Sequence, residues 1–503
     1  MGTVPSPTMT NSWPSNIQPI SGSVAWSSVS WRLPLAVFIP TATLENPSQN
    51  LESECRNSKQ LDLKLKNEKN QVTYFGGKTV SNAPVSRSKT CCCSPKPQSS
   101  LLMLRLIQFF KKSQIKDTHM TSLPLDGLDA INWARLEHAY GSAKDVPGLL
   151  RDLASRDKER GEKAVHAFYG NIWHQGTIYE ATSYAIPFLL RIVADEANPL
   201  RADTLMLLSS LAYGHSYHDV HQYMVFYEGE RDKPEFQDKV REELSWVERA
   251  HLAVGEGVPA YLHLLNDDNP DVRATAAYLA SLFSRSDATV SPALRQRLET
   301  ESEALVRATL WLGLGLDPAN VSLPLLDVAH EQATSEMERW AIYATLLRLR
   351  KGEAPPSAVE TMLEVLRNPR QSLIDFYRDV PFNEEGLVAD SAHLLLHLGT
   401  AARRFRVPLC EALARTTGVF QAMTLLGTIV PLFFGEFSRE HPVAWEQLDE
   451  DGGEVLRVLV RSDGVWGDGK SIFANLSQLV EHYGLPYNRE KMRALIPATS
   501  STA

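Results

Sequence analysis

Residues 258–282 read VPAYLHLLNDDNPDVRATAAYLASL, and this stretch decides the fold. Its apolar residues recur every three or four positions on both sides of a polar turn, which is typical of two amphipathic helices. Pro259 suits the first turn of a helix, where its missing N–H is not needed, and Asp271 is placed to cap or begin the second helix. Small alanines in the second helix allow close packing, so we predict a helical hairpin. Its expected buried stripe is Leu262, Leu265, Leu279 and Leu282.

The hairpin pattern returns along the chain. Prolines stand at 259, 292, 324 and 356, and arginines follow the first three by 14 or 15 residues, at Arg273, Arg307 and Arg339. An earlier copy has Pro187 and Arg201. One hairpin cannot bury its apolar face alone, so stacked repeats must do this for each other. We therefore predict an all-α fold, an α-solenoid of helical hairpins with a concave face. Its arginines should bond backbone or acidic groups between repeats, and a row of ligand-binding arginines is the alternative.

The order Pro-x-Leu-Leu, Asn/Asp-Pro and Val-Arg-x-x-Ala-Ala resembles HEAT repeats, most clearly over residues 257–284. The resemblance covers roughly 185–350 and extends less clearly to about 437. The runs Gly170–Gly176 (GNIWHQG) and Tyr179–Thr182 (YEAT) are similar to those of bacterial HEAT-repeat proteins of unassigned function. The resemblance implies an α-solenoid and brings no catalytic residue with it. The chain departs from the pattern after 356, and 375–390 reads as a loop.

Residues 1–119 differ from the rest of the chain. They hold 14 of the 51 Lys and Arg and 6 of the 60 Asp and Glu, which leaves 37 basic and 54 acidic residues in 120–503. This first segment is rich in Ser, Pro, Thr and Asn, so we expect it to be disordered. Cys91–Cys93 are a weak indication of a metal or lipidation site. Residues 101–112 (LLMLRLIQFFKK) could form a short interfacial helix, which is too short to span a bilayer. Met120 is an alternative start of the protein.

We expect the repeats to occupy 120–437 and a helical cap to occupy 438–503, where it would cover the last repeat. Asn488 is a good N-cap for a helix over 489–496. The chain lacks a charged signal-peptide start and an apolar run long enough to span a membrane. Outside the first segment it has a single cysteine, Cys410, which suits a reducing cytoplasm.

The run GNIWHQGTIYE, from Gly170 to Glu180, interrupts the repeat rhythm. Tryptophan and histidine combine apolar surface with a polar group, so the run forms either a well-packed turn between helices or part of a binding pocket. The candidate binding residues are Trp173, His174, Gln175 and Glu180.

A second interruption, residues 213–239, combines histidines with aromatic residues. The spacing from Pro187 to Pro259 is more than two repeats, so a degenerate repeat or an insertion lies here, and inserted loops often carry function. The series H-x-x-H-x-x-H indicates surface or groove-lining histidines, with a metal site completed by Asp219 or Glu228 as the alternative. The candidate binding residues are His215, His218, His221 and Tyr223.

Residues 464–471 (GVWGDGKS) fit the letters of a phosphate-binding loop. Such a loop must follow a buried strand in a parallel sheet, and only 32 residues remain after Ser471. We therefore expect a glycine-rich turn between helices.

Together these patterns favour a non-enzymatic, cytoplasmic scaffold that binds a protein or peptide on its concave face. The acidic repeats favour a basic partner, and they disfavour nucleic acid, whose phosphates need many Lys and Arg contacts. We expect no catalytic residues, metal, cofactor or membrane partner. The alternative is a nucleic-acid-binding or DNA-repair protein, because some HEAT-like solenoids are similar to DNA glycosylases. A third class, factors akin to phycobilin lyases, has no specific cysteine or acidic signature here.

Overall fold

A computed structural model describes residues 125–222, 227, 229–318, 323–467 and 474–497. The described chain is mostly helical with few strands, which confirms the all-α prediction. It contains no helix that is both long and apolar enough to cross a membrane. The predictions for residues 1–119, including the cysteine cluster and the helix at 101–112, fall outside the described residues. The boundaries expected at 119 and 437 stay predictions.

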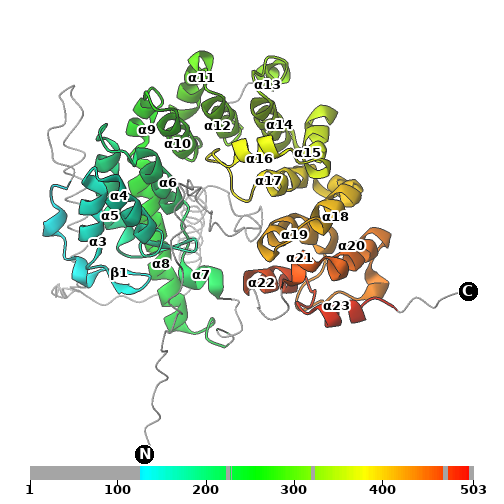
Figure 1. The fold of residues 1–503 in the computed structure, drawn as a ribbon. Helices are drawn as coiled ribbons and strands as arrows, with labels where there is room; N and C mark the ends of the chain where they lie inside the picture. Colours follow the sequence, from blue (N-terminus) through cyan, green and yellow to red (C-terminus); the bar gives the residue numbers. More distant parts are fainter. Residues whose placement is uncertain (1–124, 223–226, 228, 319–322, 468–473, 498–503) are drawn as a thin grey trace, which may run out of the picture. The chain divides into compact units, whose positions relative to one another are not determined.

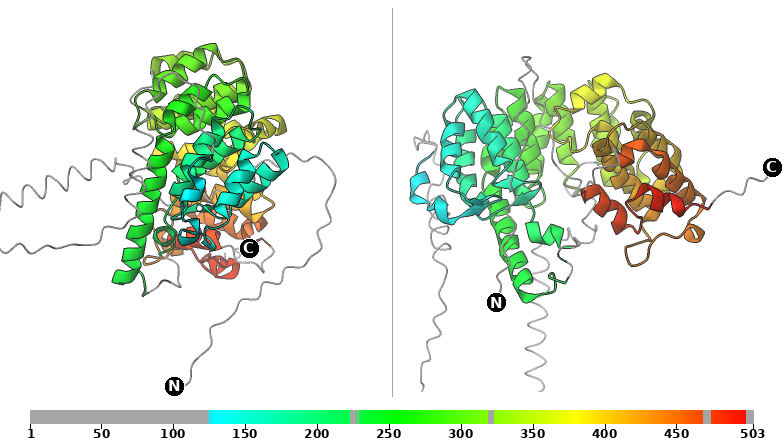
Figure 2. Two further views of the ribbon diagram at one scale, coloured as in Figure 1. Left: turned by 90° about the vertical axis from the view of Figure 1, so that its left-hand side faces the viewer. Right: turned by 60° about the horizontal axis from the view of Figure 1, so that its bottom comes forward.

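The described residues form two compact units, 125–257 and 258–497, which we call the N-terminal and C-terminal units. The N-terminal unit consists of η2 (Leu128–Ala130), η3 (Trp133–Arg135), β1 (Glu137–His138), β2 (Gly141–Ser142), α3 (Val146–Ala154), α4 (Lys158–Phe168), β3 (Trp173–His174), β4 (Thr177–Ile178), α5 (Thr182–Val193), α6 (Arg201–Ala212), α7 (Tyr217–His221) and α8 (Pro234–Gly255). Helices α5 and α6 pack on each other, and both pack on α8. The long helix α8 extends beyond their ends (Figure 2).

The C-terminal unit has no strand among its described residues. It consists of α9 (Val258–Leu264), α10 (Pro270–Ser281), α11 (Val290–Thr300), α12 (Ala304–Leu314), α13 (Leu323–Ala329), α14 (Glu336–Arg350), η5 (Lys351–Glu353), α15 (Pro356–Arg367), α16 (Gln371–Tyr377), α17 (Leu387–Leu394), η6 (Leu395–Phe405), α18 (Arg406–Ala414), α19 (Val419–Phe434), η7 (Trp445–Gln447), α20 (Glu450–Arg461), α21 (Asp463–Trp466), α22 (Ala474–His482) and α23 (Arg489–Ala494).

The predicted hairpins are present as α9–α10, α11–α12 and α13–α14. The second helices of these hairpins form a row in which α10 packs on α12 and α12 packs on α14. Figure 1 shows α11 and α13 on the outer side of this second-helix row. The helices approach closely, because a Cβ added to Gly313 in α12 would lie 2.9 Å from Cβ of Ser281 in α10. Small residues thus set the spacing of the row, as the alanine-rich sequence predicts.

Of the two roles predicted for Asp271, capping α10 or beginning it, the structure shows the second, and part of the predicted buried stripe is wrong. The N-cap of α10 is Asn269, whose side chain accepts from the backbone N–H of Asp271 at 2.9 Å. Asp271 instead lies in the first turn, where its charge favours the helix dipole. The buried stripe includes Leu265, Leu279 and the fully buried Tyr261, whereas the predicted members Leu262 and Leu282 are partly exposed.

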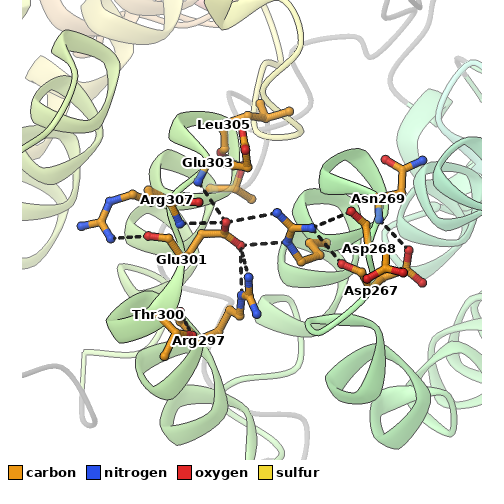
Figure 3. A network of polar contacts seen from close by, with 12 residues as sticks. Asp267, Asp268, Asn269, Arg297, Thr300, Glu301, Glu303, Leu305 and Arg307 are labelled. Atoms are coloured by element: carbon orange, nitrogen blue, oxygen red, sulfur yellow. Dashed lines mark hydrogen bonds and ion pairs between the residues drawn. The ribbon is translucent and has the colours of Figure 1, made fainter.

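The arginines at the start of the second helices connect neighbouring repeats (Figure 3). Arg273 donates to both carboxylate oxygens of Glu301, at 2.8 and 3.1 Å, and to the backbone carbonyls of Asp267 and Asp268. Arg297 donates to the same carboxylate. These contacts confirm the structural prediction for Arg273.

The next repeat continues the pattern. Arg307 donates to Oε1 of Glu338 at 2.8 Å through Nε and at 2.6 Å through Nη2, and to the backbone carbonyls of Leu298 and Glu301. In the N-terminal unit, Arg201 donates to the backbone carbonyl of Val193 at 3.0 Å. Arg339 differs from the other arginines: it is exposed and makes no ion pair with any described residue. The arginine prediction is therefore wrong for this position.

The loop predicted at 375–390 is shorter in the structure, because α16 continues to Tyr377 and α17 begins at Leu387. Residues 371–386 interrupt the hairpin pattern and lie along the second helices. Tyr377 at the end of α16 packs edge-on against Trp340 of α14, with ring centroids 4.9 Å apart. Phe382, in the loop that follows, packs edge-on against Tyr278 of α10 at 4.7 Å. The segment thus reaches two members of the second-helix row.

The end of the chain is helical, as expected. Asn488 caps α23 by accepting from the backbone N–H of Lys491 at 2.9 Å, which confirms that prediction. Helix α20 begins at Glu450, and Asp449 caps it by accepting from the backbone N–H of Gly452.

Candidate functional site

The two interrupting stretches of the N-terminal unit lie side by side. Strands β3 and β4 form a tight antiparallel hairpin whose turn places Gln175 and Gly176 at positive φ (49° and 90°). The segment after α6 pairs with β4: the backbone N–H of His215 donates to Gly176 at 2.8 Å, and its carbonyl accepts from Ile178 at 3.1 Å. Gly214 permits this approach, since a Cβ there would lie 2.1 Å from Cγ2 of Ile178.

A carboxylate from α8 fixes the next turn of chain. Glu243 is 4% exposed. Its Oε2 accepts from the Ser216 hydroxyl and from the His218 backbone N–H, both at 2.8 Å, and its Oε1 lies 2.6 Å from Nδ1 of His218. Ser216 in turn caps α7 by accepting from Asp219 at 3.1 Å. Glu243 therefore sets both the backbone of α7 and the orientation of one imidazole.

This contact determines which nitrogen of His218 is available. A carboxylate can only accept, so Nδ1 is the donor and carries the proton. Nε2 has no hydrogen-bond partner among the described residues. His138 is different: its Nε2 bonds Asp145 at 2.8 Å and its Nδ1 accepts from the Tyr140 backbone at 3.1 Å, so both nitrogens are used. His138 thus has a structural role, whereas His218 keeps a free acceptor.

Aromatic rings surround His218. Its ring centroid lies 5.4 Å from Tyr217, 5.7 Å from Tyr227 and 5.3 Å from Phe236. Tyr217 also packs on His221 at 4.3 Å. We call Tyr217, His218, His221, Tyr227 and Glu243 the histidine–tyrosine site. On the neighbouring β3–β4 hairpin, His174 packs at 5.5 Å against Tyr140, which is 73% exposed.

The histidines around the site are neutral near pH 7, and the charges acting on them are mainly acidic. Burial lowers the pKa of His174, His215 and His221 below the usual value of 6.5. Asp219 acts to raise the pKa of His215, and Glu243 acts to raise those of His221, Tyr179 and Tyr227, whereas His218 acts to lower the pKa of His221.

The remaining predicted residues have different surroundings. Trp173 is buried and packs edge-on against Tyr169 at 5.5 Å, so it belongs to the core. Gln175 is exposed at the hairpin turn, and Glu180 is half-buried with a pKa raised by burial. Tyr223 lies outside the described residues. The binding roles of all these residues stay predictions.

The sequence did not point to Glu243. It lies 25 residues beyond His218 on another helix, among many acidic residues that face solvent. The described residues contain no group of three or more His, Cys, Asp or Glu placed to hold a metal ion. His221 uses its Nδ1 on the backbone carbonyl of Tyr217 at 2.7 Å.

The run that resembles a phosphate loop follows helix α20 and not a strand. Its first residues form the short helix α21, and Gly467 then adopts a φ of 58°; residues 468–473 lie outside the described chain. Gly464 and Gly467 line a shallow hollow of about 620 Å³ with Thr416 and Ser462. The preceding strand that phosphate binding would need is therefore absent from this described part of the chain.

A second polar cluster lies in the C-terminal unit, beside residues 371–386. Oδ2 of Asp390 accepts from the Tyr377 hydroxyl at 2.8 Å and from the Glu384 backbone at 3.3 Å. Burial, with help from the Glu384 charge, raises the pKa of Asp390 to about 7, and burial raises the pKa of Glu385 to about 8. The sequence marks this region only as a loop.

No protein-family model, curated protein or solved structure matches the chain. The resemblance to HEAT repeats therefore stays an expectation from the sequence.

Proposed function

We propose that the chain is a non-enzymatic, cytoplasmic scaffold, a HEAT-like α-solenoid whose concave face binds a basic protein or peptide. The observation that carries the proposal is the second-helix row. Helices α10, α12 and α14 pack in sequence order, and buried Arg–Glu pairs connect each repeat to the next. Repeat proteins built in this way present an extended surface for a partner.

Charge indicates the kind of partner. Residues 120–503 carry 37 basic and 54 acidic side chains, and much of the basic set is engaged in pairs such as Arg273–Glu301 and Arg307–Glu338. An acidic surface attracts basic partners and raises their association rate.

The segment 371–386 adds acid on the side of the second helices. Phe382 packs on α10, and Glu384, two residues further along the chain, is exposed. A basic partner lying along the second-helix row would meet the Glu384 carboxylate.

The test isolates partners of the tagged full-length chain from its native cytoplasm, purifies each candidate separately and measures binding by size-exclusion chromatography and titration. We expect a one-to-one complex that weakens several-fold in the Glu384→Gln variant. Glu299→Gln, an exposed change on the first helix α11, serves as the matched control and should leave binding unchanged.

Failure of every purified candidate to bind would overturn the proposal, as would equal binding by both variants. Tight binding of duplex DNA in a gel-shift assay at physiological salt would favour the nucleic-acid alternative instead.

A further inference from the structure

The Nε2 atom of His218 is a hydrogen-bond acceptor that the fold positions but does not use. Glu243 holds the ring from behind through Nδ1, at 2.6 Å, and fixes the neighbouring backbone through the His218 N–H. The described residues supply no donor to Nε2. A ring fixed in this way points a single lone pair toward a ligand.

We propose that the histidine–tyrosine site anchors a lysine or arginine side chain of the partner. This inference rests on the proposed function, because it assumes a basic protein partner, and it specifies where one basic side chain binds.

The chemistry of the acceptor favours a cationic donor. An ammonium or guanidinium group has only donors, and in the neutral ring that donates through Nδ1 the Nε2 atom offers only an acceptor. The Glu243 carboxylate behind the ring supplies the negative charge that makes such a hydrogen bond stronger than a neutral one. An anionic ligand would bring its own acceptors to a site that presents another acceptor beside a buried carboxylate.

The rings supply the second recognition element. Tyr217 and Tyr227 lie 5.4 and 5.7 Å from the imidazole, and Tyr227 also lies 5.1 Å from Phe236. A lysine or arginine cation is attracted to the face of such rings when it lies within about 6 Å of their centroids. A cation that donates to Nε2 would lie beside these rings.

The electrostatic surroundings agree with this ligand. The carboxylates of Asp219 and Glu243 act to raise the pKa values of His215, His221 and Tyr227, whereas His218 acts to lower the pKa of His221. The nearby imidazoles of His215 and His221 are neutral near pH 7, because burial lowers their pKa. The imidazoles of His215 and His221 therefore supply no positive charge near pH 7 to compensate the carboxylates beside them.

The test measures binding of labelled peptides to the full-length chain by fluorescence anisotropy at physiological salt. The probes are acetyl-(Gly-Lys)3, acetyl-(Gly-Arg)3 and, as the acidic comparison, acetyl-(Gly-Glu)3. The variant His218→Asn keeps an amide nitrogen where Nδ1 donates to Glu243, but it lacks the Nε2 acceptor. His166→Asn, an exposed change on α4, is the matched control.

We expect the basic peptides to bind the wild-type chain and the acidic peptide not to bind. His218→Asn should weaken basic-peptide binding about tenfold or more, the usual loss for a hydrogen bond to a charged group. Tyr217→Leu should weaken it several-fold through loss of a cation–π contact, and His166→Asn should have no effect. A ¹⁵N spectrum of histidine side chains gives an independent readout, because the Nε2 signal of His218 should shift when peptide is added.

Equal binding by wild type and His218→Asn, or no shift of the Nε2 signal in the presence of bound peptide, would overturn the anchor and leave the scaffold proposal intact. If peptide binding depends on His218 but the chain binds no protein from its native cytoplasm, the anchor is supported and the scaffold proposal is overturned.

Discussion

Removing the Glu301 carboxylate should destabilise the C-terminal unit more than any surface change. Glu301 has a side chain that is 1% exposed, and it accepts four hydrogen bonds from Arg273 and Arg297. It also accepts from the backbone N–H groups of Ser302 and Glu303, at 3.0 and 2.9 Å. Glu301→Gln keeps the shape but leaves two guanidinium charges without their counter-charge.

Two estimates give the magnitude. Breaking a buried ion pair by removing one member costs about 3–5 kcal/mol. The pKa gives a second figure: burial acts to raise it, but hydrogen bonds from Arg273, the Glu303 backbone and Arg297 outweigh burial and lower it from 4.5 to about 2. At about 1.4 kcal/mol for each tenfold change in the acid constant, this corresponds to roughly 3 kcal/mol. Arg297 is 19% exposed and can turn toward water, so we expect about 3 kcal/mol.

The assay is urea unfolding of the full-length chain, with hydrogen exchange measured on peptides from α10 to α12. Hydrogen exchange is needed because two compact units can unfold in separate steps. The matched control is Glu299→Gln, an exposed change on the same helix, which should stay within about 0.5 kcal/mol of wild type. A Glu301→Gln variant within about 1 kcal/mol of wild type would refute the reasoning.

The same group predicts an acid dependence. Because its folded pKa is lower than its unfolded pKa, its contribution is present above about pH 4.5 and is lost as the pH falls toward 2. The Glu301→Gln variant should lack this part of the acid transition.

Three further predictions concern other parts of the chain. The pKa of Asp390 is raised to about 7, so the folded state binds more protons than the unfolded state between about pH 4 and 7, and stability falls as the pH rises through that window. The free energy of unfolding of Asp390→Asn, relative to that of wild type, should therefore be roughly 2–4 kcal/mol higher at pH 8 than at pH 4 in urea unfolding. No such gain would contradict the buried position of the carboxyl. Gly214→Ala should destabilise the N-terminal unit by about 1–3 kcal/mol and increase hydrogen exchange in the β3–β4 hairpin, because the new methyl group meets Ile178; unchanged exchange would show that the hairpin can shift. Burial raises the pKa of the Cys410 thiol to about 11, so peptide mapping after iodoacetamide treatment should find it modified in urea but not in buffer.

The sequence predicts the repeat unit well because its signals are local. The apolar spacing of residues 258–282, the prolines at the starts of helices and the small residues between helices all act within one hairpin. The sequence leaves open whether Asp271 caps or begins α10, and the structure places the cap two residues earlier, at Asn269, in a turn rich in Asp and Asn.

Contacts between repeats are harder to predict. Arg273 and Arg307 stand at regular positions, but their acceptors Glu301 and Glu338 lie 28 and 31 residues further along the chain. Glu301 lies at the end of α11, the first helix of its hairpin, whereas Glu338 lies in the first turn of α14, the second helix of its hairpin. The two acceptors therefore have no fixed position in the repeat that the sequence could reveal. The same difficulty applies to the histidine–tyrosine site, where the sequence highlights His218 but not Glu243.

The way in which the histidine–tyrosine site is assembled has a consequence for biosynthesis. The β3–β4 hairpin beside the site, α7 and Glu243 are synthesised in chain order, and 65 residues separate Ile178 from Glu243. At about 5–20 residues per second, a ribosome needs roughly 3–13 seconds to add that stretch. Until α8 emerges, Ser216 and His218 lack their carboxylate, so a nascent chain that ends before α8 cannot form the site. The repeats that follow, in contrast, gain each connecting Glu about 30 residues after its Arg, so they can be added one at a time.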